Sequence, residues 1–147
     1  MSALLRPGWS PANWREEWRR EGESFLVTVK HHTEPIDAHR PEKGPHRWAV
    51  YAYVYPPHPR FSTLRDGMGI FDDALFDWPL HCGCSRIQVY RVNGTEITSF
   101  EIGADYAHSG DDHFTFYNTP DLASSVFFDA DRLFDFLSAP IPGEAAP

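Results

Sequence analysis

The sequence predicts a single α+β domain, in which an antiparallel sheet of four or five strands carries an N-terminal and a C-terminal helix packed on it. Three observations support this prediction, and the first is that several segments alternate apolar and polar side chains as half-buried strands do. Asn93 and Gly94 form the residue pair that a tight hairpin turn prefers. Apolar residues near the carboxyl end recur at helical spacing. The 147 residues are the size of one domain, and we expect about 1–8 and 140–147 to be loosely ordered.

The first predicted element is a helix at about 11–21. Pro11 suits the first position of a helix, and Gly22 is a natural stop. Trp14 and Trp18 are four residues apart, so on a helix they share one face. Because few other residues here are apolar, we expect this helix to lie on the domain surface and to dock through its tryptophans.

Two strands are predicted next, at about 24–32 and 47–55. The first alternates in polarity, and the second is apolar on both faces, which is typical of a central strand. The prolines and the glycine within 33–46 indicate a long loop between the two strands. Residues 60–80 are expected to be irregular, with a short helical turn near 72–76.

A β-hairpin is predicted around Asn93 and Gly94, because both central positions of a type I′ turn need a positive φ. A two-residue turn fixes which residues face each other across the two strands. The predicted pairs are Arg91 with Glu96, Tyr90 with Ile97, Ile87 with Phe100 and Arg86 with Glu101. Two of them join opposite charges and two join apolar side chains, each worth roughly 0.2–1 kcal/mol.

The last third begins with a polar loop, 104–113, and a predicted short strand at 114–117. A helix follows, with Asp129 or Ser125 as its cap and Pro140 just beyond its end. The apolar residues that define its buried face are Val126, Ala130, Leu133, Phe134 and Leu137.

Negative charge gathers in this last third. Residues 1–100 hold 12 basic and 12 acidic residues, whereas residues 101–147 hold 9 acidic residues and one basic residue, so they carry the whole net charge of -8. A protein that binds duplex nucleic acid needs a basic face, which argues against that function. The excess favours the basic surface of a partner protein, a bound cation, or solubility alone. The predicted partner-binding residues are Asp129, Asp131 and Asp135.

The sequence also predicts a cytoplasmic protein that does not enter a membrane. It contains no run of about 18 apolar residues. Residues 1–9 lack the long apolar stretch of a secretory signal. Cys82 and Cys84 are too close in sequence for a relaxed disulfide, so we expect reduced thiols.

A cluster of ligand-type side chains follows a predicted strand, where functional sites often lie. Its members are Asp105, His108, Asp111, Asp112 and His113. Imidazoles and carboxylates together could hold Zn²⁺ or another divalent transition metal with a position left for water. The alternative is structural, because aspartates bond turn amides, Gly110 can supply a positive φ, and the histidines can pack at the sheet edge.

A second candidate is the segment from His81 to Cys84. Cys84 could act as a nucleophile with His81, His108 or His113 as its base. The segment has one cysteine pair and no second one, so it does not match a zinc ribbon. The alternative for Cys84 is a small buried hydrophobic residue.

A row of tyrosines offers a third candidate, because Tyr51, Tyr53 and Tyr55 share one face of the predicted central strand. Such a row could stack on a nucleotide or another small ligand, or simply pack the sheet. The common phosphate-loop, dinucleotide and serine-hydrolase motifs are absent from the sequence.

Two stretches resemble segments of small uncharacterised proteins encoded by phages and prophages. They are Trp48-Ala-Val-Tyr-Ala-Tyr-Val-Tyr-Pro-Pro-His-Pro and the stretch from Gly103 to His113 with the Phe114-Thr-Phe-Tyr that follows. The resemblance implies a small accessory protein that needs no cofactor and acts by binding a protein, for example as an inhibitor of a host defence system. A metal-dependent hydrolase and a small-ligand binder remain the alternatives.

Overall fold

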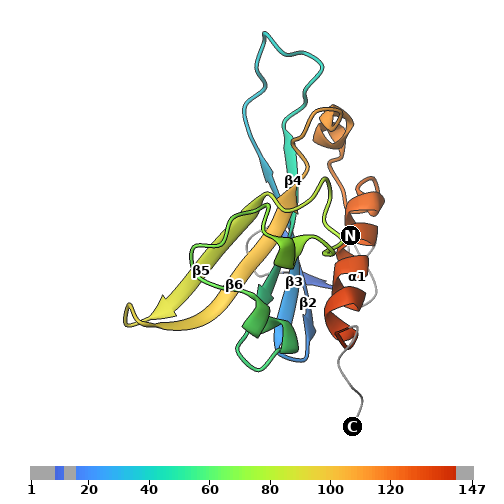
Figure 1. The fold of residues 1–147 in the computed structure, drawn as a ribbon. Helices are drawn as coiled ribbons and strands as arrows, with labels where there is room; N and C mark the ends of the chain where they lie inside the picture. The colour runs from blue at the N-terminus through green and yellow to red at the C-terminus, as the bar shows by residue number, and fades with distance from the viewer. Residues whose placement is uncertain (1–8, 12–15, 142–147) are drawn as a thin grey trace.

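The computed structural model of the chain, which describes residues 9–11 and 16–141, has one antiparallel sheet with a helix on one of its faces (Figure 1). Hydrogen-bonded neighbours follow the order β1-β2-β3-β4-β6-β5, so β6 lies between β4 and β5. The strands are β1 (Ser10–Pro11), β2 (Glu17–Gly22), β3 (Phe25–Thr33), β4 (His46–Val54), β5 (Arg86–Val92) and β6 (Glu96–Asp105).

The predicted α+β class and antiparallel sheet are confirmed. Five strands have six residues or more, and β1 adds a two-residue strand beside β2. The strands predicted at 24–32 and 47–55 are β3 and β4, and β4 is central as expected. The predictions for 1–8, for Trp14 and for the last six residues lie outside the described residues.

The predicted N-terminal helix is wrong, because residues 17–22 form strand β2 and pair with β3. Gly22 therefore does not end a helix. It lies opposite Phe25 across a two-residue turn in which Ser24 has a φ of 65°. A Cβ on Gly22 would lie 2.1 Å from the Phe25 ring, so glycine leaves room for that ring at the hairpin end.

Aromatic packing explains why this segment is a strand. Trp18 stacks on Trp48 with ring centroids 5.9 Å apart and meets Phe127 edge-on at 5.5 Å. The guanidinium of Arg20, on the same face of β2, lies 3.8 Å from the centre of the Phe134 ring. A short isolated helix is marginal in water, whereas buried aromatic pairs contribute about 0.5–1.5 kcal/mol beyond their area. The strand places these groups in the core.

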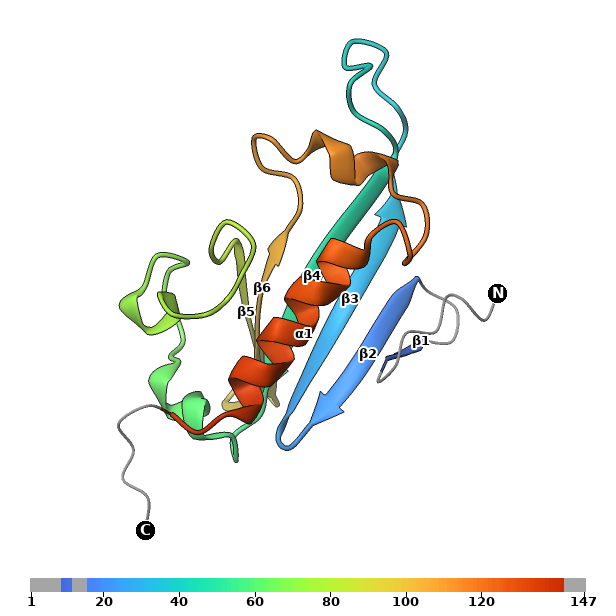
Figure 2. The ribbon, with the colours of Figure 1, turned by 90° about the vertical axis from the view of Figure 1, so that its right-hand side faces the viewer.

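Helix α1 (Ser124–Ser138) lies over β2, β3 and β4 and covers one face of the sheet (Figure 2). Its buried residues are Val126, Phe127, Ala130, Leu133 and Leu137. Four of the five residues predicted for the buried face are thus confirmed. The fifth, Phe134, is only half-buried, and Phe127 is buried instead. The predicted caps are wrong, because the N-cap is Ala123 and no side chain bonds to it. Among the described residues, no helix is both long enough and apolar enough to span a membrane.

The turn of the β5–β6 hairpin is confirmed in its two left-handed residues, but the loop between the paired residues Val92 and Glu96 holds three residues, 93–95, and not two. Asn93 and Gly94 have φ angles of 52° and 75°, and the Thr95 N–H donates to the Val92 carbonyl at 3.1 Å. Both left-handed positions are therefore filled by the residue types that tolerate them at least cost.

The predicted register of this hairpin is wrong. The observed pairs include Val92–Glu96, Arg91–Ile97, Tyr90–Ser99, Ile87–Ile102 and Arg86–Gly103. The three-residue loop moves the first pairs by one position. Thr98 has no partner in the ladder and forms a β-bulge, which moves the pairs beyond it by a second position. A shift of two keeps every side chain on its face. Arg86 therefore still reaches Glu101, with its Nε 3.0 Å from the carboxylate.

Short 3₁₀ helices occupy the connections: η2 (Pro59–Thr63), η3 (Asp73–Leu75) and η4 (Asp112–Phe116). The helical turn predicted near 72–76 is confirmed by η3, whose first turn is capped by the Asp72 carboxylate. The strand predicted at 114–117 is wrong, because the Tyr117 N–H donates to the Phe114 carbonyl in η4. This turn buries Phe114 against Tyr106 instead of extending it along the sheet.

The face of the sheet turned away from α1 holds a buried carboxylate. Glu101 is 1% exposed and accepts hydrogen bonds from Tyr53 at 2.7 Å, Tyr90 at 2.8 Å and Arg86 at 3.0 Å. The ammonium of Lys30 lies 3.7 Å away. Burial opposes ionisation, but these hydrogen bonds outweigh it and lower the pKa of Glu101.

Candidate metal centre

The sheet brings two loops together at one end of the β5–β6 hairpin. The loop before β5 contains residues 80–85, and the loop after β6 contains residues 106–111. Ser85 ties the first loop to the end of β6, because its N–H donates to the Gly103 carbonyl at 2.9 Å and its Oγ accepts from the Asp105 N–H at 3.0 Å. The side chains of the two loops therefore meet although they are more than twenty residues apart in sequence.

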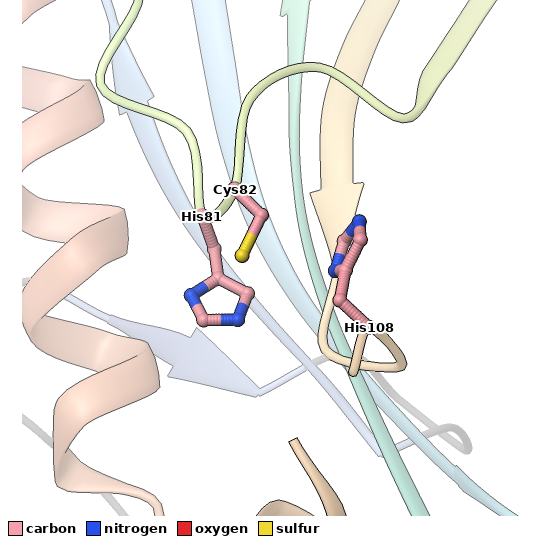
Figure 3. A group of neighbouring side chains, drawn as sticks. All are labelled: His81, Cys82 and His108. Atoms are coloured by element: carbon pink, nitrogen blue, oxygen red, sulfur yellow. The ribbon is translucent and has the colours of Figure 1, made fainter. Parts of the chain in front are cut away.

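Three ligand-type side chains converge there. His81, Cys82 and His108 each present one ligand atom, and these atoms all lie within 4.8 Å of one another. Figure 3 shows the Cys82 sulfur above the His81 ring, with the His108 ring facing both from the opposite loop. His81 and His108 are half-buried and Cys82 is exposed, so the group lies at the protein surface.

A tight turn presents Cys82. The Gly83 N–H donates to the Leu80 carbonyl at 3.0 Å, and Cys82 and Gly83 have φ angles of 57° and 85°. Few residues other than glycine, asparagine and aspartate adopt this left-handed conformation, and holding one there costs of order 1–3 kcal/mol. This turn leaves the Cys82 side chain exposed and beside His81.

His81 is held by aromatic packing. Its ring stacks on Tyr106 with centroids 4.2 Å apart and an interplanar angle of 16°, and it meets Phe114 edge-on at 5.5 Å. The Tyr106 hydroxyl donates to Asp129 at 2.7 Å, which fixes the tyrosine. The imidazole orientation is therefore set by the fold and not by the loop alone.

Asp111 connects the two histidines. His81 Nε2 lies 2.9 Å from each of its carboxylate oxygens, and His108 Nδ1 lies 3.3 Å from Oδ2. The same Oδ2 accepts the His108 backbone N–H at 2.8 Å. Asp111 is buried, which opposes ionisation, but the bonds from His108 and His81 outweigh burial and lower its pKa. Gly110, with a φ of 91°, makes the turn that brings Asp111 back to His108, as predicted.

This donor set suits a divalent transition metal. A thiolate and imidazoles favour Zn²⁺ and similar ions over Mg²⁺ or Ca²⁺, which prefer oxygen ligands. One thiolate and the Asp111 carboxylate together offset a charge of +2. Ligand atoms around tetrahedral Zn²⁺ stand about 3.3–3.6 Å apart, given Zn–N near 2.0–2.1 Å and Zn–S near 2.3 Å. Ligand atoms that lie within 4.8 Å of one another would therefore have to close by no more than roughly 1.3–1.5 Å on binding.

The predicted metal residues divide into two groups. His108 and Asp111 lie at the centre, and Asp105 lies at its edge, with Oδ1 3.7 Å from His108 Nδ1. His113 is exposed and packs on the rings of Phe114 and Tyr117. Asp112 belongs to η4, and its carbonyl accepts the Thr115 hydroxyl. Neither His113 nor Asp112 belongs to the three-residue group.

The structure places the two cysteines differently. Cys84, the predicted nucleophile, is buried, and its thiol donates to the Arg86 carbonyl. Burial raises its pKa, which disfavours the reactive thiolate. Its neighbour Cys82, which the sequence analysis did not propose as a site residue, is the exposed one. The predicted base His81 lies beside Cys82.

The three aspartates predicted to bind a partner do not have equal access to solvent. Asp131 accepts hydrogen bonds from the Trp9 indole and from Arg20, both at 2.9 Å. Asp129 accepts from Tyr106. Asp135 is exposed. Asp131 is thus partly neutralised by a basic residue from β2, which weakens the patch as a charged surface.

The tyrosine row is part of the sheet packing. Lys30 and Arg86 lie over the Tyr51 ring, and the Tyr53 hydroxyl donates to Glu101. Burial and this hydrogen bond raise the pKa of Tyr53. Tyr55 follows the end of β4 and is half-buried. These contacts give each of Tyr51 and Tyr53 a structural role within the chain.

Comparisons of the chain with protein-family models, with curated proteins and with solved structures found no match. The resemblance to phage and prophage proteins therefore stays a prediction, and the functional argument depends on the geometry of the site.

Proposed function

We propose that the chain binds a divalent transition metal, Zn²⁺ by preference, through His81, Cys82 and His108, and that the bound ion activates water for a hydrolytic reaction. The observation that carries the proposal is the convergence of three ligand atoms within 4.8 Å from two loops of the sheet. This takes up the metal-dependent hydrolase that the sequence offered as an alternative and changes its ligand set, because His81 and Cys82 come from the loop before β5.

Two features favour a catalytic ion over a structural one. Structural zinc sites are closed by four cysteine or histidine ligands, whereas catalytic sites use three protein ligands and keep a position for water. The group offers three such ligands at the surface. The chain also has an extensive apolar core of its own, so the fold has no need of a metal to support it.

Each residue has a distinct role in the proposed centre. Cys82 would supply a thiolate, and His81 and His108 would supply neutral imidazoles, each binding the ion through the ring nitrogen that does not face Asp111. The bound ion lowers the pKa of its water to near 7. Asp111 orients both imidazoles, and its ionised carboxylate offsets part of the charge of the ion.

Metal titration of the untagged, reduced chain tests this proposal. We expect one Co²⁺ per chain, with a thiolate-to-cobalt charge-transfer band, displacement by Zn²⁺ and a melting temperature that rises with free metal. Cys82→Ser should remove the charge-transfer band, and both Cys82→Ser and His108→Ala should weaken binding at least tenfold, because each removes a ligand from a three-ligand site.

His113→Ala is the matched control, because His113 is an exposed histidine of the neighbouring η4 turn outside the group. It should bind metal as the unmodified chain does. Loss of binding in His113→Ala together with normal binding in His108→Ala would place the ion elsewhere, and a chain that takes up no Co²⁺ would refute the centre.

The Asp111→Asn variant is expected to weaken Zn²⁺ binding by about 10- to 100-fold, as loss of a hydrogen-bonded carboxylate behind metal-binding histidines does. The amide keeps the shape but loses the charge that offsets the ion. Competition with a chromophoric chelator measures the effect. Asp121→Asn, an exposed aspartate of the same last third, serves as the control and should leave the affinity unchanged. Equal affinity in the two variants would show that Asp111 does not support the ion.

A further inference from the structure

An apolar pocket adjoins the proposed metal centre and shares one of its residues. The pocket has a volume of about 430 Å³. Its lining is formed by Ile70, Phe71, Asp72, Asp73, Leu75, Phe76, Trp78, Cys82, Gly83 and Cys84. Because Cys82 belongs both to this lining and to the three-residue group, a molecule bound at the metal has the pocket beside it.

The lining includes two phenylalanines that the fold leaves in water. Phe71 is 92% exposed and Phe76 is 91% exposed. Burial of each ring could remove some 150–250 Å² of surface from water. Because both rings are exposed, on either side of η3, they do not contribute this hydrophobic stabilisation to the fold. Paired exposed aromatic side chains at a concave site are typical of a surface that binds a ligand.

The floor of the pocket is buried, whereas the two phenylalanines that line it are exposed. Leu75 and Trp78 are buried in the core, and Trp78 packs on Phe136 of α1. Among the described residues, the Trp78 Nε1–H has no hydrogen-bond partner. The pocket therefore combines a buried apolar floor with two exposed aromatic side chains.

The volume sets the size of the group that fits. A cavity of about 150 Å³ holds benzene, so about 430 Å³ has room for a group of two fused rings or a phenyl ring with a short linker.

The charge of the rim narrows the class further. Asp72 is paired with Arg65 and caps η3, whereas Asp73 is exposed. A neutral or cationic group is therefore preferred over an anionic one.

We infer that the proposed centre acts on substrates carrying a neutral aromatic or bulky apolar group, which binds in the pocket formed by Phe71, Phe76 and Trp78 while the scissile group reaches the metal at Cys82. This inference rests on the proposed metal centre and adds its substrate class. Phe71 and Phe76 are then specificity-determining residues, and they do not hold the ion.

Hydroxamates test the inference, because they bind an open metal position through one invariant group and vary only in their substituent. On the Co²⁺-loaded full chain, we expect naphthyl hydroxamate and benzohydroxamate to bind at least tenfold more tightly than acetohydroxamate. The absorption of the bound cobalt reports binding. The double variant Phe71→Ala, Phe76→Ala should lose this preference and keep the affinity for acetohydroxamate.

Phe128→Ala is the matched control, since Phe128 is an exposed phenylalanine of α1 that does not line the pocket. It should keep the preference. Equal affinity for the three hydroxamates, or a preference that survives in the double variant, would overturn the inference and leave the metal centre standing. A chain that binds no Co²⁺ would overturn the proposed function and this inference with it.

Discussion

Replacing Glu101 by leucine is expected to lower the free energy of unfolding by about 3–5 kcal/mol, the usual cost of removing one partner from a buried ion pair. The variant leaves the hydroxyls of Tyr53 and Tyr90 and the guanidinium of Arg86 without their shared acceptor. Urea unfolding at pH 7 measures the loss.

The stability that Glu101→Leu loses depends on pH, and the direction of this dependence follows from the lowered pKa of Glu101. The folded-state pKa of Glu101 is lowered, so its ionised form stabilises the fold above the unfolded pKa of about 4.3. That contribution declines as the pH falls below about 4.3 toward the lower folded pKa. The difference in stability between the unmodified chain and Glu101→Leu should therefore narrow on acidification. The other carboxylates are present in both chains, so their effects on stability cancel in this difference.

Glu96→Leu is the control for the hydrogen bonds and ion pairs of Glu101, because Glu96 is an exposed glutamate of the same strand. Its effect should stay within about 0.5 kcal/mol, as for most surface substitutions. A Glu101→Leu variant as stable as this control, or a difference that does not change between neutral and acid pH, would show that the carboxylate is not held as described.

The Gly103→Ala variant is expected to lose about 3 kcal/mol or more, at the upper end of what overpacking costs. A Cβ at this position would lie 2.3 Å from the Val50 carbonyl oxygen and 2.2 Å from the Tyr51 ring. The carbonyl is part of the neighbouring strand and cannot rotate away, so β4 and β6 would have to separate. Thermal unfolding of the variant measures the cost.

Gly69→Ala gives the comparison, because nothing lies within 4 Å of a Cβ built there and Gly69 has no positive φ. Alanine at such a position is neutral or slightly stabilising. If the two variants melt at the same temperature, the close approach of β4 and β6 at Gly103 is not a constraint on the fold.

Local sequence signals predicted the elements that depend on local properties. The alternation of β3, the two-faced apolar pattern of β4 and the left-handed pair Asn93 and Gly94 each determine backbone geometry directly. The periodic face of α1 also belongs to this class, because burial on one side of a helix needs no knowledge of its partner.

Elements that depend on distant partners were predicted wrongly. The spacing of the tryptophans and the proline at position 11 favoured a helix, but Trp18 is buried against Trp48 and Phe127, far away in sequence. The hairpin register failed for another reason. The loop holds three residues, 93–95, where two were predicted, and the bulge at Thr98 adds another residue that no turn rule reveals.

The candidate centre could be predicted only in part. His108 and Asp111 were proposed from their clustering, and His81 as a possible base. Cys82 was missed, because Cys84 was proposed as the nucleophile instead. One signal was available: since the predicted hairpin already pairs Arg86 with a residue near the end of the next strand, it places the loop before β5 beside the loop after β6. The backbone conformation that exposes Cys82 has no local signature in a non-glycine residue.

The bulge at Thr98 also affects how the molecule meets copies of itself. Strand β5 is the last in the order of the sheet, and its outer backbone groups could template another chain. The extra residue increases the local twist, and the charged side chains of Arg86 and Arg91, paired with Glu101 and Asp66, lie along this border. A flat edge strand without charged side chains would pair more readily with a strand of another molecule. The irregularity that defeated the register prediction therefore works against aggregation through that edge.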